Sequence, residues 1–285
     1  MTPLDYDFLR KLLKERSGLD LSADKQYLVE SRLVPLARKA SLGGIPELVQ
    51  KIQRGGAEAL TTEVVEAMTT NETFFFRDKI PFDHLRDTIL PMMQQSRTNR
   101  RSLRIWSAAC STGQEPYSIA MLLKEKAAAL SGWRIEIVAT DLSQEVLEKS
   151  KAGIYSQFEV QRGLPIQLLV KYFAQIGELW QLNSEIRAMV QHKPLNLLQD
   201  FSHLGKFDVI FCRNVLIYFD QDTKINIFDR MAKSIEPDGM LMLGAAESVV
   251  GITDAFRPYP DKRGLYQPNH ERGGARAPLR VAASR

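Results

Sequence analysis

Several residues that could bind a polar ligand directly follow apolar stretches of this sequence. Glu115 comes after a turn of small residues spanning positions 107–113, and Asp141 closes the apolar stretch IVATD. Arg213 and Asn214 come directly after FDVIFC. The carboxyl ends of parallel strands meet at one edge of a sheet, and ligands bind in the crevice at that edge. If the three stretches are parallel strands, we expect these side chains to line a single crevice.

The turn before Glu115 restricts which ligand this crevice can hold. The segment Leu103–Leu130 predicts a buried strand, a tight turn of small residues and an amphipathic helix opened by Pro116. Gly113 is the only glycine of the turn, which therefore has neither the GxGxxG of a dinucleotide site nor the GK[ST] of a P-loop. A small-residue turn beside a carboxylate suits a ligand that carries a positive group and no phosphate. S-adenosylmethionine, with its ribose, amino group and sulfonium, meets both conditions.

Asp141 and Tyr218 add to this prediction, although each has a structural alternative. An acidic residue at the end of the second strand can accept hydrogen bonds from both ribose hydroxyls, but Asp before a helix is also a common N-cap. Tyr218, four residues after Asn214, could place its hydroxyl in the same opening or could pack its ring with the hydroxyl at the surface.

The segment TTNETFFFRD, residues 69–78, mixes polar groups with three phenylalanines. The phenylalanines alone indicate a hydrophobic linker plug. Asn71, Thr73 and Arg77 intersperse hydrogen-bonding groups with that plug, at the expected junction between two domains. Domain junctions are preferred ligand sites, so these three residues are also candidates for the site.

The elements that position these residues lie in two regions with different sequence patterns. The first 70 residues contain only helical patterns, which predicts a small all-α domain. One helix carries Leu4 to Leu13 and ends near Gly18, and a second carries Tyr27 to Ala37 with Ser22 as its expected N-cap. Two shorter helices are expected at Pro46–Gln53 and Glu58–Met68.

From Arg104 onward strands alternate with helices, which predicts an α/β fold with a doubly wound, mostly parallel sheet. The stretch about 164–195 interrupts that alternation and predicts an inserted subdomain, in which ELWQLN and IRAMVQH would form a β-hairpin. We expect an α/β domain over 71–268 and a disordered basic tail over 269–285. The strands are expected at Arg104–Ala109, Arg134–Thr140, Phe207–Cys212 and Gly239–Gly244, and the helices between them at Tyr117–Leu130, Gln144–Lys151 and Thr223–Ser234.

Charge and composition restrict the classes of partner. The chain has a net charge of +4. From residue 262 onward six basic residues and one glutamate give +5, so residues 1–261 carry a net charge of −1. A folded part without net positive charge is a weak candidate for nucleic-acid binding. No run reaches the roughly 20 apolar residues of a membrane span, so we expect a cytoplasmic protein without membrane insertion. Cys110 and Cys212 match no metal spacing, and we interpret them as small buried residues that could line the crevice.

Five segments together resemble the CheR family, the chemoreceptor glutamate methyltransferases of bacterial chemotaxis. They are NETFFFR, WSAACSTGQEPYSIA, ATDLSQEVLEKSKAGIY, FDVIFCRNVLIYFD and PDGMLMLGAAES, in order across residues 71–248. The resemblance implies a Rossmann-like S-adenosylmethionine-dependent methyltransferase domain preceded by an all-α domain. It places S-adenosylmethionine, or its product S-adenosylhomocysteine, against Asn71, Thr73, Arg77, Glu115, Asp141, Asn196, Leu197, Arg213 and Asn214, and it places Arg77 and Tyr218 nearest the transferred methyl group.

The implied reaction is methyl-ester formation on receptor glutamates, and it fits the side chains present. An exposed glutamate, with an ordinary pKa of about 4.3, is ionised at neutral pH and needs no general base. The four histidines lie outside the matching segments. What the reaction needs is alignment of the reacting groups and loss of the nucleophile's water, for which Arg77 could orient the carboxylate and Tyr218 could donate a hydrogen bond.

Two features depart from the family pattern. Family members often have two consecutive carboxylates where this chain has Gln114 and Glu115, so Glu115 alone can supply the charge. The segment Gly177–Ser184 is more compact than the glycine-bearing loop of relatives that tether to a peptide at the receptor's C-terminus. We therefore expect no dependence on such a tether.

Two other functions remain open at this point. A nucleic-acid methyltransferase that modifies amino groups would be expected to carry a [DN]PP[YFW]-like turn where this chain has CRNVLIYF. A non-catalytic sensor that binds the cofactor is disfavoured by the presence of Arg77 and Tyr218. The partner we expect is the cytoplasmic helical bundle of a chemoreceptor, bound by a monomer whose basic stretch Lys25–Arg54 is either a docking surface for an acidic protein or a solvated helix face.

Overall fold

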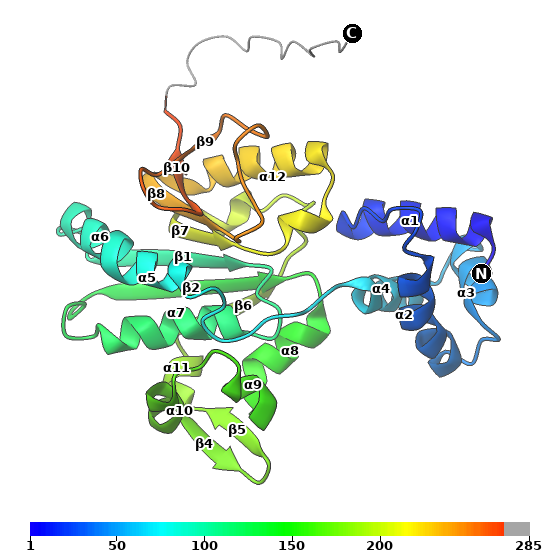
Figure 1. Cartoon of the computed structure of the whole chain (residues 1–285), viewed down its shortest axis with the longest axis horizontal. Helices are drawn as coiled ribbons and strands as arrows, with labels where there is room; N and C mark the ends of the chain where they lie inside the picture. The colour runs from blue at the N-terminus through cyan, green and yellow to red at the C-terminus, as the bar shows by residue number, and fades with distance from the viewer. Residues whose placement is uncertain (271–285) are drawn as a thin grey trace.

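A computed structural model describes residues 1–270 of the chain, which form a helical domain, an α/β domain and a small inserted sheet (Figure 1). The expected disordered tail lies, from residue 271 on, outside the described residues. In the part of the chain that is described, no helix is long and apolar enough to cross a membrane.

The helical domain has the four helices expected from the sequence. Thr2 forms a capping box with Asp5 at the start of the first helix, and Gly18 ends that helix in the left-handed conformation with φ of 78°. The prediction that Ser22 caps the second helix is wrong: Lys25 occupies the N-cap without a side-chain bond, and the Ser22 hydroxyl bonds Asp24 instead. The helices are α1 (Pro3–Ser17), α2 (Gln26–Lys39), α3 (Ile45–Gln53) and α4 (Glu58–Met68).

A second helical stretch, not expected from the sequence, precedes the sheet. It consists of α5 (Ile80–His84), a π-helical turn η1 (Leu85–Ile89) and α6 (Leu90–Ser96). Phe82, Leu85 and Ile89 pack in the same core as α7 (Gln114–Glu125). The stretch therefore covers one face of the sheet beside α7 (Figure 1). α7 begins two residues before Pro116 and ends at Glu125 rather than at Leu130.

The main sheet has seven strands in the order β6-β2-β1-β7-β8-β10-β9. β10 pairs antiparallel with both β8 and β9, and the other neighbouring strands pair in parallel. Side chains alternate between its faces: Ile105 lies in the core shared with α7, whereas Trp106 lies in the core shared with α12 (Gln221–Lys233). Helices thus cover both faces, as predicted for a doubly wound sheet. The strands are β1 (Ser102–Ala108), β2 (Arg134–Asp141), β6 (Val190–Pro194), β7 (Phe207–Cys212), β8 (Ile235–Leu243), β9 (Phe256–Pro258) and β10 (Leu265–Pro268).

The inserted sheet has three antiparallel strands in the order β3-β5-β4. The predicted pairing of its hairpin is wrong. The strand β5 (Leu179–Leu182), within ELWQLN, pairs with β4 (Phe173–Ile176), while the later stretch forms β6 at the edge of the main sheet. The other elements of this region are β3 (Ile154–Ser156), α8 (Gln144–Ala152), α9 (Gln157–Gln161), α10 (Ile166–Tyr172) and α11 (Ser184–Arg187).

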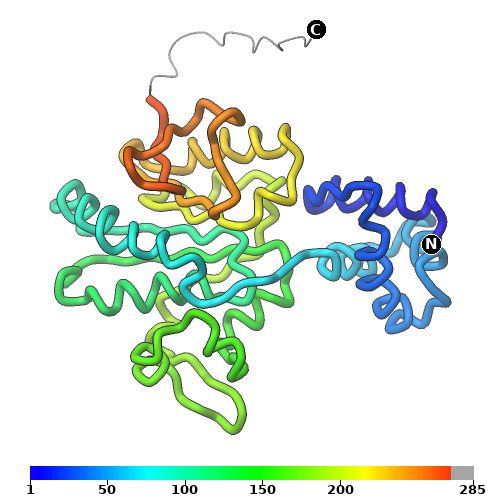
Figure 2. The backbone as a smooth tube through the Cα atoms, viewed as in Figure 1, coloured from blue at the N-terminus to red at the C-terminus, as the bar shows by residue number. Residues whose placement is uncertain are grey.

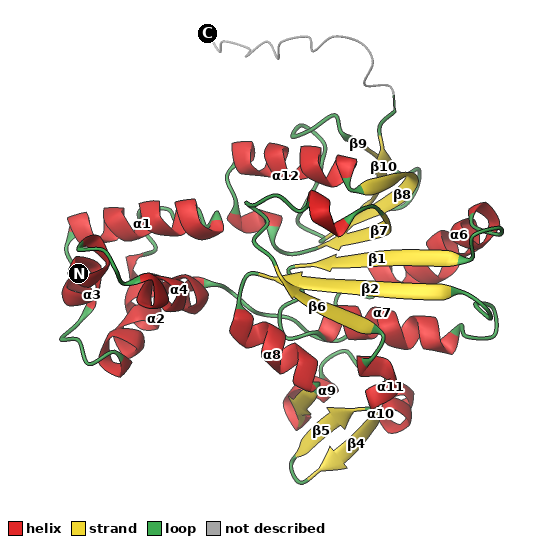
Figure 3. Cartoon of the chain, turned by 180° about the vertical axis from the view of Figure 1, so that it is seen from behind, coloured by secondary structure: helices red, strands yellow, loops and turns green. Residues whose placement is uncertain are grey.

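The carboxyl ends of the parallel strands point toward the helical domain (Figure 3). The linker after α4 runs from that domain along the end of the sheet to α5 (Figure 2). Arg32 of α2 holds the start of the linker by donating to the carbonyls of Met68 and Thr69, at 2.7 and 2.8 Å. Two domains and their linker therefore meet where the sequence places the candidate ligand residues.

Candidate functional site

One cavity, of about 1020 Å³ including its opening to solvent, lies at the carboxyl edge of the sheet between the two domains. The structure brings together every site residue expected from the sequence. All ten line this cavity: Asn71, Thr73, Arg77, Glu115, Asp141, Asn196, Leu197, Arg213, Asn214 and Tyr218.

The turn after β1 is held in a conformation that leaves room for a ligand. Ala109 and Ser111 have φ of 57° and 50°, and Gly113 has φ of 96°. A Cβ at Gly113 would lie 2.1 Å from the Ser150 hydroxyl oxygen, so the turn and α8 approach too closely for any side chain there. Cys110 N–H donates to the carbonyl of Thr140 at 2.9 Å, which ties the turn to the end of β2. The glycine of the turn is thus required by packing against α8.

Asp141 at the end of β2 is the partner that fixes this turn. Its carboxylate accepts hydrogen bonds from the backbone N–H groups of Ser111, at 2.8 Å, and Ser143, at 3.0 Å. Burial raises the pKa of Asp141, and these N–H groups oppose that shift. Asp141 is not the N-cap of α8, because Ser143 occupies that position. Asp141 therefore reaches the cavity with its orientation already set by the turn on which a ligand would lie.

Glu115 and Arg213 form an ion pair at the floor of the cavity. Arg213 donates to the Glu115 carboxylate at 2.9 Å, and Ser107 donates to the other oxygen at 2.8 Å. Burial raises the pKa of Glu115, while Arg213 opposes the rise. The other end of Arg213 bonds Asp78 at 2.7 Å, yet its buried Nε has no hydrogen-bond partner among the described residues. An unsatisfied buried donor is costly, and Arg213 is one of the residues that line the cavity.

The linker forms one wall of the cavity. The Asn71 carbonyl accepts from the Ser111 hydroxyl at 2.9 Å, and Arg77 donates to the carbonyl of Glu72 at 2.6 Å while lying over the Phe74 ring. Phe75 is fully buried in the core of the α/β domain. Both interpretations of the segment hold: its phenylalanines anchor it, and its polar residues face the cavity.

The linker continues into a strained turn. Phe76, Asp78 and Lys79 have φ of 52°, 67° and 49°, in the left-handed region that non-glycine residues rarely occupy. Arg213 holds this turn by donating to the Arg77 carbonyl at 2.8 Å and to Asp78. The same guanidinium thus connects the position of Arg77 to the Glu115 side of the cavity.

The segments after β6 and β7 complete the lining. Asn196 donates to the carbonyl of Arg16 in α1 at 2.7 Å and accepts from the N–H of Leu198 at 2.9 Å. Asn214 has φ of 58°. Tyr218 is half-buried, and its carbonyl accepts from the N–H of Asp20 at 2.9 Å. Asn196 therefore contacts the end of α1, and Tyr218 contacts the residues that follow it.

Ser17 and Leu19 also line the cavity, and sequence reasoning missed both. Gly18 between them carries the only local signal, because it marks the helix end. A Cβ at Gly18 would lie 2.8 Å from the ring of Phe219, so the helix end packs closely against the segment that carries Tyr218. About 200 residues separate the two segments, and no local pattern predicts that contact.

Both cysteines and His192 are covered by protein in or near this region. Both cysteines are free and buried, and burial raises the pKa of each thiol. Cys110 lines the cavity, whereas Cys212 is not part of the lining. His192 of β6 lies behind the turn at 2.7 Å from the Ser150 hydroxyl, and burial lowers its pKa to about 4. Among the described residues no cluster of three or more His, Cys, Asp or Glu could hold a metal ion.

Comparison with known proteins identifies relatives over both domains. The family model described as CheR methyltransferase, all-alpha domain, matches residues 4–69, and that described as CheR methyltransferase, SAM binding domain, matches residues 71–265. The chain is 43% identical over 253 residues to chemotaxis protein methyltransferase 1 of Vibrio cholerae, covering 88% of this chain and 90% of that protein. It is also 43% identical over 259 residues to chemotaxis protein methyltransferase 1 of Pseudomonas aeruginosa, covering 89% and 93%.

Proposed function

Because the chain belongs to the CheR family of S-adenosylmethionine-dependent methyltransferases, we propose that it methylates glutamate side chains on the cytoplasmic helical bundle of chemoreceptors. The product is a glutamyl methyl ester, and the protein acts in the cytoplasm as a monomer. The observation that carries the proposal is the meeting of all ten predicted residues in one cavity between the two domains.

The lining of the cavity suits S-adenosylmethionine. The turn after β1 exposes a small-residue backbone, and Glu115 and Asp141 give the lining carboxylates rather than phosphate-binding groups. Asp141 would hold the ribose, while Asn71, Thr73, Glu115, Asn196, Leu197, Arg213 and Asn214 would hold the remainder. The bound cofactor supplies a methyl group on a sulfonium.

The residues nearest the proposed reaction supply orientation rather than proton transfer. Arg77 already has one donor committed to the Glu72 carbonyl, so it would orient the acceptor carboxylate with its remaining donors. A tight bidentate pair would lower the nucleophilicity of that carboxylate. Tyr218, half-buried in the lining, would donate one hydrogen bond. The walls from the linker and the end of α1 would exclude water from the nucleophile.

The helical domain offers a surface for an acidic receptor. Arg38, Lys51 and Arg54 are exposed, whereas Arg32 is committed to linker carbonyls and Lys39 pairs with Glu63 at 3.2 Å. Part of the basic stretch is therefore structural, and the exposed part is what we assign to receptor docking.

Methyl transfer from labelled S-adenosylmethionine to a receptor cytoplasmic domain tests the proposal. We expect label that mild alkali releases as volatile methanol, that is absent when the acceptor glutamates are changed to alanine, and that Arg77→Ala reduces about 100-fold because alignment is lost. Base-stable label on nucleic acid would contradict carboxyl methylation. Cofactor binding without label on any receptor of a panel would favour the non-catalytic sensor.

A further inference from the structure

One carboxylate, to which the proposed function assigns no role, accepts hydrogen bonds from the backbone of the segment that carries Asn214 and Tyr218. Glu247, in the segment after β8, is 9% exposed. One of its oxygens accepts from the backbone N–H groups of Asn214 and Gly244, each at 2.8 Å. The other accepts from the N–H groups of Val215, at 3.0 Å, and Leu216, at 2.8 Å. All of these donors belong to the backbone.

The backbone of the turn is shaped around this carboxylate. Asn214 adopts φ of 58°, which is uncommon for a residue with a side chain. Successive N–H groups in such a turn converge to form an anion-binding nest. Here the carboxylate of Glu247 fills the nest, so it compensates the left-handed conformation that directs Asn214.

Gly244 shows how closely the parts fit. A Cβ at Gly244 would lie 2.7 Å from the Glu247 carboxylate, 2.9 Å from the Asn214 amide nitrogen and 3.0 Å from the Asn214 backbone nitrogen. The glycine therefore lets the end of β8, the carboxylate and the turn after β7 meet. The pair Gly244 and Glu247 accounts for two residues of GAAES, whose chemistry the proposed function left unassigned.

We propose that Glu247 is a positioning residue that sets Asn214 against the cofactor and, through η3 (Leu216–Tyr218), Tyr218 against the reacting groups. The part that concerns Tyr218 rests on the proposed function. A carboxylate is required because both oxygens accept. Glutamine would place an NH2 donor against N–H donors, so Glu247→Gln breaks half of the contacts without changing side-chain size.

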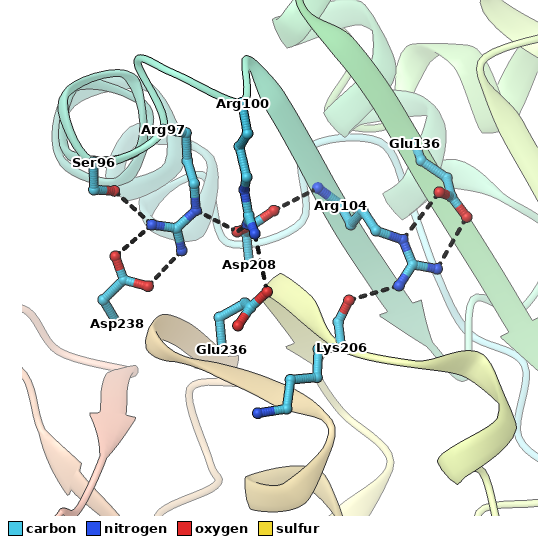
Figure 4. Close-up of polar contacts among 9 residues, drawn as sticks. All are labelled: Ser96, Arg97, Arg100, Arg104, Glu136, Lys206, Asp208, Glu236 and Asp238. Carbon is cyan, nitrogen blue, oxygen red and sulfur yellow. Dashed lines mark hydrogen bonds and ion pairs between the residues drawn. The ribbon is translucent and has the colours of Figure 1, made fainter.

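Asp208 provides a matched control at the opposite end of the same strands. It is 1% exposed and accepts from the Arg97 side chain at 2.9 Å, from the Arg104 backbone at 2.8 Å and from the Arg100 side chain. Figure 4 shows this network together with Glu236 and Asp238. Asp208→Asn alters a buried carboxylate of comparable connectivity, but none of the residues that donate to Asp208 lines the cavity. Asn214 and Val215, which donate to Glu247, do line it.

The test compares Glu247→Gln, Glu247→Asp and Asp208→Asn with the unaltered full chain. Hydrogen exchange of the amides of residues 214–216 is measured by mass spectrometry, together with the Kd of S-adenosylhomocysteine by calorimetry and the thermal midpoint. We expect Glu247→Gln to speed exchange at residues 214–216 and to raise the Kd at least about tenfold, as loss of a buried hydrogen-bond network implies. Glu247→Asp keeps the carboxylate, so we expect it to recover part of the slow exchange at residues 214–216 and part of the affinity for S-adenosylhomocysteine.

We expect Asp208→Asn to lower the thermal midpoint as much as Glu247→Gln does. The Kd of S-adenosylhomocysteine should stay within about twofold of that of the unaltered chain. The proposal is overturned if Glu247→Gln leaves the exchange of residues 214–216 unchanged, or if Asp208→Asn weakens binding as much as Glu247→Gln. The exchange readout needs neither cofactor nor receptor. Failure of the proposed reaction would appear only in the methyl-transfer assay, so the two failures are distinguishable.

Discussion

At the scale of single residues, three charged side chains of the cavity already form hydrogen bonds within the protein. Asp141 holds the turn after β1, and Glu115 and Arg213 hold each other. Such groups cost little reorganisation when a ligand arrives, which is the condition for an effective binding site. Because these side chains bond one another or the backbone, a substitution of one also disturbs its partners. A test of a catalytic role therefore needs a side chain that makes fewer hydrogen bonds to the protein.

Tyr218 is such a side chain, and Tyr218→Phe tests its proposed role. The change removes only the hydroxyl and keeps the ring, so we expect kcat to fall about tenfold, the value of one hydrogen bond made in the transition state. The Kd of S-adenosylhomocysteine should stay within about twofold, because the cavity keeps its shape. Steady-state methylation and calorimetry measure the two quantities. Full activity of Tyr218→Phe would remove the hydroxyl from the mechanism.

At the scale of elements, α8 packs against the turn after β1 and is itself bonded to β6 and α7. Ser150 of α8 lies against Gly113 and bonds His192 of β6, and its carbonyl accepts from the Tyr117 hydroxyl at 2.7 Å. β6 was not recognised in the sequence as a strand of the main sheet. Through Ser150, the histidine of β6 is nevertheless connected to α8 and α7 next to the candidate site.

His192 should make stability depend on pH. Burial, and then Lys151, lowers its pKa to about 4 from an ordinary 6.5. Between these values the folded state binds fewer protons than the unfolded state, so the free energy of unfolding falls as the pH drops through that window. Replacing His192 by glutamine removes this titration and should flatten the decline by about 1–2 kcal/mol, allowing for partial exposure. Urea unfolding at pH 7 and near pH 4.5 measures it, and parallel declines would contradict the assignment.

At the scale of the whole molecule, the helical domain is a wall of the candidate site as well as a docking surface. Ser17 and Leu19 line the cavity, and Lys14 pairs with Asp220 at 2.7 Å. Three consecutive residues, Tyr218, Phe219 and Asp220, each contact the end of α1 or the residues after it. The domain therefore helps to hold the segment that carries Tyr218.

Gly18→Ala tests this coupling between the domains. Gly18 has φ of 78°, and an added methyl would meet the Phe219 ring at 2.8 Å. We expect a loss of stability of about 1–3 kcal/mol and a several-fold lower kcat, because Phe219 neighbours Tyr218. Gly55, with φ of 82° and nothing within 4 Å of such a methyl, is the matched control. Gly55→Ala should pay about 1 kcal/mol of backbone strain alone and keep kcat. Equal kcat in both variants would show that the domain contact does not position Tyr218.

Much of the fold could be predicted because its signals are local. The four helices of the helical domain follow from apolar periodicity, and the left-handed end of α1 from Gly18. The apolar runs that became β1, β2, β7 and β8 were recognised for the same reason. The prediction of the hairpin pairing was wrong because the composition of β4 and of β6 makes either a suitable partner for β5. Strand pairing depends on the surrounding packing rather than on the strand itself.

The crevice follows from local sequence patterns: the small residues between β1 and α7 and the polar side chains at the ends of the strands converge once parallel strands align. The contacts that support the crevice and complete its walls depend on long-range packing. The carboxylate of Glu247 is 31 residues from Leu216 along the chain, and the end of α1 is 180 residues from Asn196. Neither contact has a sequence period or a turn signature, because each is selected by long-range packing of complete elements.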